Sequence, residues 1–396
     1  MRRDVYLVLI AQFLTAFADN AILFTAITMV NQAAQSPAWY VPALQASFLV
    51  AFVLFAPWVG PYSDGRLKAT VMTTANIVKG VGAAMLMLQI EPLLSYAIVG
   101  LGAAMYSPAK YGILPELVDE KQLVKANGWI EGSTILAILA GMLVGSLLSE
   151  KSITLALAVV VGLYVVSAVV ALWITRLPAE KPNHGPALPH FAKMVRRLLS
   201  TPRARFSTLG VSLFWASSVV LRVLLVAWAP AVLMMTHTSD IALLTMFLAI
   251  GIAVGALFAA RLIPLAYLRR ARMAAYGLGV AALALSFVDT IWGARVVLFM
   301  AGIAGGLFVV PINAALQEIG HKSIGAGGAV AVQNFFESLA MLVASGVYTL
   351  AAGLGAAPSA TMVALGVFVL IATFLVSWHL PPDTGEIAEA VPPNGD

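Results

Sequence analysis

Ionisable side chains lie inside long apolar segments of this sequence, where each would cost about 2.5–3.5 kcal/mol or more against lipid. Such a residue persists when it faces a cavity or a charged partner, so these positions are the first candidates for chemistry. They are Asp19, Lys79, Lys110, Glu131, Arg222, Arg295 and Glu337.

Helical spacing predicts which polar residues share a face. In the first apolar segment Gln12, Thr15, Asp19 and Asn20 recur at intervals of three, four and seven residues, and they therefore align along one side. Four further segments repeat the pattern, with Asn76 and Lys79, with Asn127, Glu131 and Thr134, with Ser218 and Arg222, and with Gln333, Asn334 and Glu337. Five helices are thus expected to turn a polar stripe toward an interior.

The mixture of acids, bases and amides favours a headgroup that carries phosphate together with ammonium or hydroxyl groups. Arginine binds phosphate through a bidentate fork, carboxylates bind ammonium, and amides bind hydroxyls. The predicted substrate-binding residues are Asp19, Asn20, Lys79, Lys110, Glu131, Arg222, Gln333, Asn334 and Glu337. Two alternatives stay open: some charges form internal salt bridges, such as Asp19 with Arg222, or the apolar walls accommodate a drug. Arg295 is expected to snorkel to the outer interface.

The elements that position these residues are predicted to be membrane-spanning helices. The chain has 396 residues, of which 61% are hydrophobic and 10% charged. This balance excludes disorder and an ordinary soluble enzyme. The first apolar run begins directly after Asp4 and contains polar residues, so we interpret it as a permanent helix and not a cleaved signal. The predicted spans are 5–33, 40–62, 69–90, 93–117, 124–149, 153–176, 206–236, 239–262, 271–289, 291–318, 324–354 and 357–380.

One long connector divides the twelve spans six and six. Residues 178–205 hold five prolines and six Lys or Arg residues, and a short surface helix is expected around 189–200. The predicted domains are a six-helix bundle at 1–177, a cytoplasmic linker at 178–205, a second bundle at 206–380 and a disordered tail at 381–396. Most of the 23 Lys and Arg residues then fall on one side of the membrane, which predicts that both termini are cytoplasmic.

This layout is typical of the major facilitator superfamily, an all-α fold of two pseudo-symmetric six-helix halves. The loop from Gly60 to Lys68 is similar to the gating motif of that superfamily, Gly-x-x-x-Asp followed by basic residues. Asp64, Arg66 and Lys68 are accordingly predicted to lock helix ends together in one state of a transport cycle. An ordinary basic loop is the alternative interpretation.

The sequence lacks the residue patterns that ATP hydrolysis, metal binding or nucleophilic catalysis would require. No Gly-x-x-x-x-Gly-Lys-Ser/Thr loop is present, and the five histidines lack metal-ligand spacing. No nucleophile and base stand together, so we expect a secondary transporter and neither an enzyme nor a protein with a metal or cofactor. The net charge of +5 is attributed to cytoplasmic loops and not to nucleic-acid binding.

Two strings carry a closer resemblance. Phe-Ala-Asp-Asn ends at Asn20, and Tyr-Ser-Pro-Ala-Lys-Tyr-Gly runs from Tyr106 to Gly112. Leu221-Arg222 and Ala331-Val-Gln-Asn334 add to them. From the first helix to about residue 380 the chain resembles the bacterial lysophospholipid transporters of the major facilitator superfamily.

The resemblance implies a flippase that moves lysophosphatidylethanolamine and lysophosphatidylglycerol to the cytoplasmic leaflet of the inner membrane, without proton or sodium coupling. A cytoplasmic acyltransferase would then restore the missing chain, and the transporter is expected to be a monomer surrounded by membrane lipid. Asp19, Asn20, Lys110 and Arg222 inherit a headgroup role from the matching strings. The alternative function is a proton-coupled exporter of drugs or small amphiphiles, with Asp19, Glu131 or Glu337 as the proton site.

Overall fold

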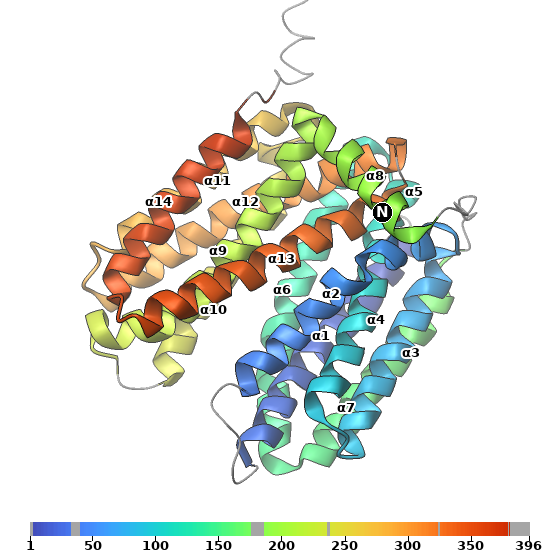
Figure 1. The fold of residues 1–396 in the computed structure, drawn as a ribbon, viewed down its shortest axis with the longest axis horizontal. Coiled ribbons are helices and arrows are strands. Elements are labelled where there is room, and N and C mark those ends of the chain that lie inside the picture. Colours follow the sequence, from blue (N-terminus) through green and yellow to red (C-terminus); the bar gives the residue numbers. More distant parts are fainter. Residues whose placement is uncertain are drawn as a thin grey trace, which may run out of the picture. The chain divides into compact units, whose positions relative to one another are not determined.

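The computed structural model describes residues 3–32, 40–175, 186–235, 238–323, 325–378 and 380, and throughout this part the chain is helical without strands. Figure 1 shows the helices as coiled ribbons. Parts of the predicted linker and the whole predicted tail at 381–396 lie outside the described residues.

The chain forms two compact units, each assembled from separate stretches of sequence. The first unit comprises 1–119, 133–196 and 317–339, and the second comprises 120–132, 197–316 and 340–396. The division into bundles at 1–177 and 206–380 stays a prediction.

The first unit contains most of the helices from the first half of the sequence. Within it α3 packs against α4 and α7, and α7 also packs against α1. The helices that begin in this half are α1 (Arg3–Gln32), α2 (Tyr40–Asp64), α3 (Lys68–Met87), α4 (Pro92–Gly112), α5 (Leu114–Leu117), α6 (Glu120–Lys151), α7 (Ile153–Leu172) and α8 (Ala187–Ser200).

The second unit contains most of the remaining helices. In it α14 packs against both α9 and α11. The elements of this half are α9 (Pro202–Leu233), α10 (Thr238–Leu262), the 3₁₀ helix η1 (Leu265–Arg270), α11 (Ala271–Leu285), α12 (Ile291–Ser323), α13 (Ala326–Gly353) and α14 (Pro358–Ser377).

Ten of the described helices are long and apolar enough to cross a membrane. The predicted spans 93–117 and 271–289 also form helices, α4 and α11, but these two are not among the ten. Helix α11 has 15 residues, which is shorter than a usual span, and α4 is diluted by Tyr106, Ser107 and Lys110. The multi-pass helical architecture is thus present, whereas the count of twelve spans stays a prediction.

Glycines allow the helices to approach closely. A Cβ on Gly102 of α4 would lie 2.6 Å from Cγ of Lys79 and 2.7 Å from the carbonyl oxygen of Ala75, both on α3. In the second unit, a Cβ on Gly251 of α10 would lie 2.2 Å from the carbonyl oxygen of Phe299 on α12. Small residues at such positions are the usual means of packing helices in membranes. Gly102 therefore makes the space in which the Lys79 side chain lies.

Candidate functional site

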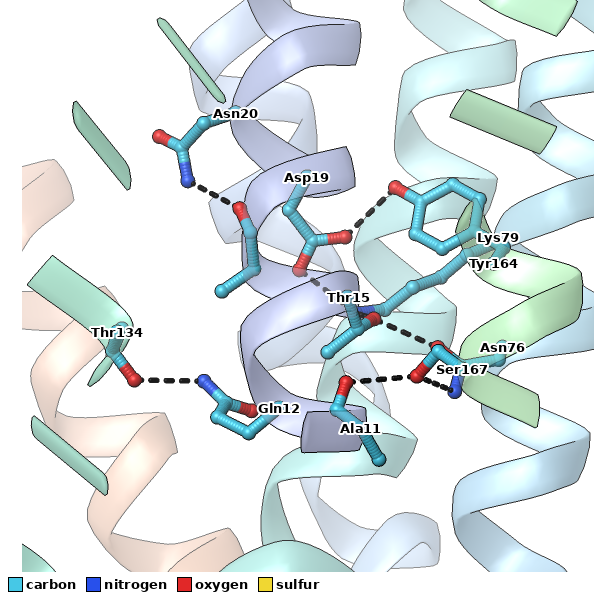
Figure 2. A network of polar contacts seen from close by, with 11 residues as sticks. Ala11, Gln12, Thr15, Asp19, Asn20, Asn76, Lys79, Thr134, Tyr164 and Ser167 are labelled. Carbon is cyan, nitrogen blue, oxygen red and sulfur yellow. Dashed lines mark hydrogen bonds and ion pairs between the residues drawn. The ribbon is translucent and has the colours of Figure 1, made fainter. Parts of the chain in front are cut away.

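A polar network links α1, α3 and α7 inside the first unit. Lys79 Nζ lies 2.8 Å from Asp19 Oδ2, and the Tyr164 hydroxyl donates a hydrogen bond of 2.8 Å to Asp19 Oδ1. Figure 2 shows Lys79 and Tyr164 approaching the Asp19 carboxylate from two different helices. Both carboxylate oxygens of Asp19 are therefore bonded within the protein.

Further side chains extend the network along the same face of α1. Thr15 accepts from Lys79 at 3.1 Å and donates to Asn76 Oδ1 at 2.7 Å. Asn76 donates to Ser167 at 2.9 Å, and Ser167 donates to the carbonyl oxygen of Ala11 at 2.8 Å (Figure 2). The polar stripe predicted from the spacing of Thr15 and Asp19 is a continuous set of hydrogen bonds.

Burial separates the roles of the two charged partners. The Lys79 side chain is 1% exposed, whereas the Asp19 side chain keeps 20% of its surface accessible. The Lys79 ammonium also lies 5.0 Å from the Tyr106 ring centre and 5.8 Å from that of Tyr164, within the range of cation–π attraction. Lys79 is thus enclosed by protein, and Asp19 retains a face that a ligand can reach.

Asn20, the neighbour of Asp19, is half-buried. Its amide nitrogen donates to the carbonyl oxygen of Ala16 at 2.8 Å, and its amide oxygen points away from the network (Figure 2). Gln12, on the same side of α1, donates to the Thr134 hydroxyl of α6 at 2.9 Å.

Tyr164 also belongs to this site, through its hydrogen bond to Asp19, and it is not among the binding residues predicted from the sequence. It lies in α7, an otherwise strongly apolar helix without ionisable groups. One signal was present: Tyr164 and Ser167 are three residues apart and therefore share a face, as the other polar pairs do.

Arg222 lies on α9 in the second unit, and its side chain is exposed. Among the described residues it has neither an ion pair nor a hydrogen bond. The counter-charge of Asp19 is Lys79, so Asp19 does not depend on Arg222 for neutralisation.

A second buried pair joins α6 to α12 within the second unit. Asn313 donates to Glu131 Oε1 at 3.2 Å, and the two residues are 2% and 3% exposed. The close approach of α6 in this unit is made at Gly128, where a Cβ would lie 2.5 Å from the carbonyl oxygen of Ala256. Glu131 is therefore held by a hydrogen bond within a packed interface.

The remaining predicted binding residues lie in the first unit. The buried Lys110 places its ammonium 3.8 Å from the Tyr111 ring centre. On α13 Gln333 donates to Glu337, and Asn334 is 7% exposed with an amide nitrogen that has no partner in the described part of the chain. A buried donor of this kind is costly unless another group satisfies it.

Asp64, the acidic residue of the predicted gating motif, is the last residue of α2 and bonds this helix to the start of α13. Its two carboxylate oxygens accept the backbone N–H groups of Gly327 and Gly328, at 2.8 and 2.7 Å. These amides lie in the first turn of α13, where N–H groups lack partners within the helix and the helix dipole favours negative charge. Lys68 lies 2.6 Å from the same carboxylate.

Arg66 has a different position from its two neighbours in the motif. It is exposed, and its guanidinium lies 4.1 Å from the ring centre of Tyr62. The structure therefore brings Asp64 and Lys68 together and leaves Arg66 outside their contact.

Comparisons with known proteins agree with this architecture. Residues 8–345 match the family model of the Major Facilitator Superfamily. The chain is 42% identical over 376 residues to the lysophospholipid transporter LplT of Klebsiella pneumoniae, with 94% of each chain covered. The chain belongs to the LplT family of the major facilitator superfamily. This membership confirms the resemblance seen in the sequence.

Other matches to LplT proteins and to solved structures extend the same result. The LplT of Photorhabdus laumondii is 42% identical over 96% of each chain, and that of Escherichia coli strain SE11 is 43% identical over 94% of this chain and 95% of its own. The Major Facilitator Superfamily transporter FucP in the outward conformation superposes with a TM-score of 0.76 at 13% identity, over 94% of this chain and 97% of FucP. The structural match supports the fold alone.

The described residues were also compared with the arrangement that a metal site requires. Within the described ranges no three His, Cys, Asp or Glu side chains gather in a way that could hold a metal ion. The expectation that the protein needs no cofactor stays a prediction.

Proposed function

We propose that this protein transports lysophospholipids, taking lysophosphatidylethanolamine and lysophosphatidylglycerol from the outer to the cytoplasmic leaflet of a bacterial inner membrane. The observation that carries the proposal is identity of 42–43% over at least 94% of the chain to transporters named for lysophospholipids. The polar sites among apolar helices suit an amphiphile with a charged headgroup.

Arg222 is proposed to bind the phosphate. Its side chain is exposed and has no partner among the described residues, and a guanidinium offers two parallel donors to phosphate oxygens. Lys110 is proposed as a second phosphate contact, because it belongs to the Tyr106–Gly112 string that resembles the family.

Asp19 and Asn20 are proposed to bind the ethanolamine or glycerol part of the headgroup. Each oxygen of a carboxylate can accept about two hydrogen bonds, so the 20% exposed Asp19 can take a ligand donor besides Lys79 and Tyr164. Asn20 leaves its amide oxygen for a hydroxyl or ammonium (Figure 2).

Lys79 is proposed to be a positioning residue. It is 1% exposed and bonded to Asp19 and Thr15, so it fixes the carboxylate and compensates its charge without reaching the ligand. Glu131, Gln333, Asn334 and Glu337 are proposed as additional binding residues, and the unsatisfied amide nitrogen of Asn334 supports this role most directly.

The transport cycle is proposed to include the release of Asp64 from α13. While Asp64 accepts both glycine amides, the ends of α2 and α13 are held together. Opening this end requires those bonds to break, after which water can solvate the carboxylate and the amides.

The cellular setting is also part of the proposal. Both termini are cytoplasmic, since this orientation places most Lys and Arg residues on the cytoplasmic side. The transporter acts as a monomer and delivers its substrate to a cytoplasmic acyltransferase, which returns the lipid to the diacyl form.

The test is uptake of labelled lysophosphatidylethanolamine by spheroplasts that express Arg222→Gln. Loss of one charge-assisted contact of about 2 kcal/mol predicts uptake reduced by about thirtyfold at equal expression. Arg295→Gln is the matched control, because Arg295 lies against the Trp292 ring and is not assigned to the ligand. Equal uptake by both variants would refute the phosphate role of Arg222.

The same assay separates the alternative function. A proton-coupled exporter of amphiphiles would stop when a protonophore collapses the proton gradient. Lysophospholipid uptake by the proposed uncoupled flippase should continue under that condition.

A further inference from the structure

A cavity of about 550 Å³ lies in the second unit, where α11 begins and α14 ends. Two arginines, Arg269 and Arg272, line it together with the aromatic side chains of Tyr276, Phe374 and Trp378. None of these residues belongs to the proposed transport site. The cavity therefore needs an explanation of its own.

The packing of α11 on α14 sets the shape of this cavity. A Cβ on Gly279 would lie 2.7 Å from Cδ2 of Leu370, and a Cβ on Gly366 would lie 2.6 Å from Cγ of Leu283. These two contacts show that the helices are antiparallel, and Figure 1 shows them side by side. Continuing the same register places Arg272, in the first turn of α11, level with Ser377 at the end of α14.

The lining divides into a cationic part and an apolar part. The arginines come from the end of η1 and the first turn of α11. On the other side the rings of Phe374 and Trp378 pack edge to face, with centroids 4.7 Å apart. Met273 and Phe374 are 65% and 49% exposed, so the apolar wall continues onto the surface.

This combination has the chemistry of a lipid headgroup site. Guanidinium groups bind phosphate through paired donors, and tryptophan and tyrosine favour the level of the headgroups at a membrane surface. We propose that the cavity binds the phosphate of an anionic diacyl phospholipid, with an acyl chain along Met273 and Phe374. The site holds a resident lipid of the leaflet at this end, separate from the transported substrate.

Further arginines surround the cavity and favour an anionic lipid as its ligand. Arg261, at the end of α10, and Arg270 are both exposed, so the cavity lies in a basic neighbourhood that attracts anionic lipid in general. A specific lipid site requires arginines that line the cavity itself, in addition to this general attraction. Arg269 and Arg272 line the cavity, whereas the Arg270 guanidinium lies 4.2 Å from the Tyr267 ring centre and is not part of the lining.

Quenching of tryptophan fluorescence by brominated phosphatidylglycerol tests the site. The full-length protein is reconstituted into phosphatidylcholine vesicles, and brominated phosphatidylglycerol is titrated against it. The signal of Trp378 is obtained as the difference between the wild type and Trp378→Phe. We expect saturable quenching of this difference signal at a low mole fraction of phosphatidylglycerol.

The decisive comparison uses two double variants that each remove two positive charges. Each arginine that hydrogen-bonds the phosphate contributes about fivefold in affinity, so Arg269→Gln/Arg272→Gln should raise the half-saturating mole fraction by about 25-fold. Arg261→Gln/Arg270→Gln should shift it by less than about twofold, since only diffuse attraction is lost. Arg272→Gln alone should give an intermediate shift and guards against a folding defect of the double variant.

Three results would overturn the proposal. The first is an equal shift in both double variants, which would show general surface charge. The second is the absence of saturable quenching in the wild type. The third is displacement of the lipid by soluble glycerol phosphate at matched concentration, which would assign the cavity to a free anion. Because the readout is lipid binding, it is independent of whether lysophospholipid is transported.

Discussion

Replacing Asp64 should shift the protein toward states in which the ends of α2 and α13 are apart. In the structure its carboxylate accepts the N–H groups of Gly327 and Gly328, at 2.8 and 2.7 Å, and it is paired with the buried Lys68. Both amides lie in the first turn of α13, so the interaction is a helix N-cap supplied by another helix.

The magnitude follows from those contacts. An N-cap contributes about 0.5–2 kcal/mol, and a negative charge at a helix N-terminus adds about 0.3–1 kcal/mol. Asp64→Ala should therefore destabilise the closed arrangement by about 2 kcal/mol, which is about thirtyfold in the equilibrium between closed and open states. Asp64→Asn keeps one acceptor oxygen and should have an intermediate effect.

The chain contains no cysteine, so labels can be introduced without removing native thiols. Spin labels are placed at Thr70→Cys, in the first turn of α3 that follows α2, and at His321→Cys, in the last turn of α12 that precedes α13. Both positions are exposed and lie in the first unit, so their distance, measured by double electron–electron resonance, follows the separation of the adjoining ends of α2 and α13. We expect a second population at longer distance in Asp64→Ala. Arg66→Gln is the matched control and should retain the wild-type distribution, because the Arg66 side chain contacts Tyr62 and not α13.

A second perturbation reaches the same contact from the other helix. A Cβ on Gly327 would lie 2.4 Å from Asp64 Oδ1, so Gly327→Ala should displace the carboxylate and reproduce the long-distance population. The reasoning fails if Asp64→Ala and Gly327→Ala both show the wild-type distance distribution.

Three further predictions concern the polar network of the first unit. Lys79→Met leaves the Asp19 carboxylate without its counter-charge, so the free energy of unfolding of the purified protein should fall by about 3–5 kcal/mol, seen as a lower melting temperature. Adding Asp19→Asn to the same chain should restore part of this loss. A Lys79→Met melting curve that matches the wild type would contradict this pairing. Tyr164→Phe removes one hydrogen bond to a charged group and should lower lysophospholipid uptake by about tenfold with little change in expression, measured in spheroplasts. Unchanged uptake would show that Tyr164 does not orient Asp19. Gly102→Val would drive a side chain into Lys79 and should destabilise the protein as Lys79→Met does, whereas Gly162→Val, at a position with open space, should be tolerated in the same thermal assay.

Much of the helical framework follows from the sequence alone. The expected span 153–176 is α7 (Ile153–Leu172), and the short helix expected near 189–200 is α8 (Ala187–Ser200). The expected span 93–117 instead ends at Gly112 and is followed by the separate turn α5, which has Pro115 at its start. The pattern of apolar residues predicts long helices well, but it does not predict a short break such as the one between α4 and α5.

The site residues were predictable as faces and not as pairs. The spacing of Thr15 and Asp19 predicted one polar side of α1, and the structure confirms that both belong to a network. The spacing could not show which helix lies opposite, since partner choice depends on how helices pack. The spacing therefore predicts Lys79 as a ligand contact, and this stays a prediction. The structure adds that the Lys79 side chain is enclosed by Asp19 of α1, Tyr106 of α4 and Tyr164 of α7.

The contact between Asp64 and the start of α13 would be difficult to detect from related sequences. Its acceptor is a side chain, but its donors are backbone amides, and every residue except proline carries such an amide. The partner positions are constrained by size, because a Cβ on Gly327 would collide with the carboxylate, and not by chemical type. Covariation between paired positions, which depends on compensating side-chain changes, would consequently miss this contact. A comparison of sequences would register the carboxylate and the small residues as two unrelated signals.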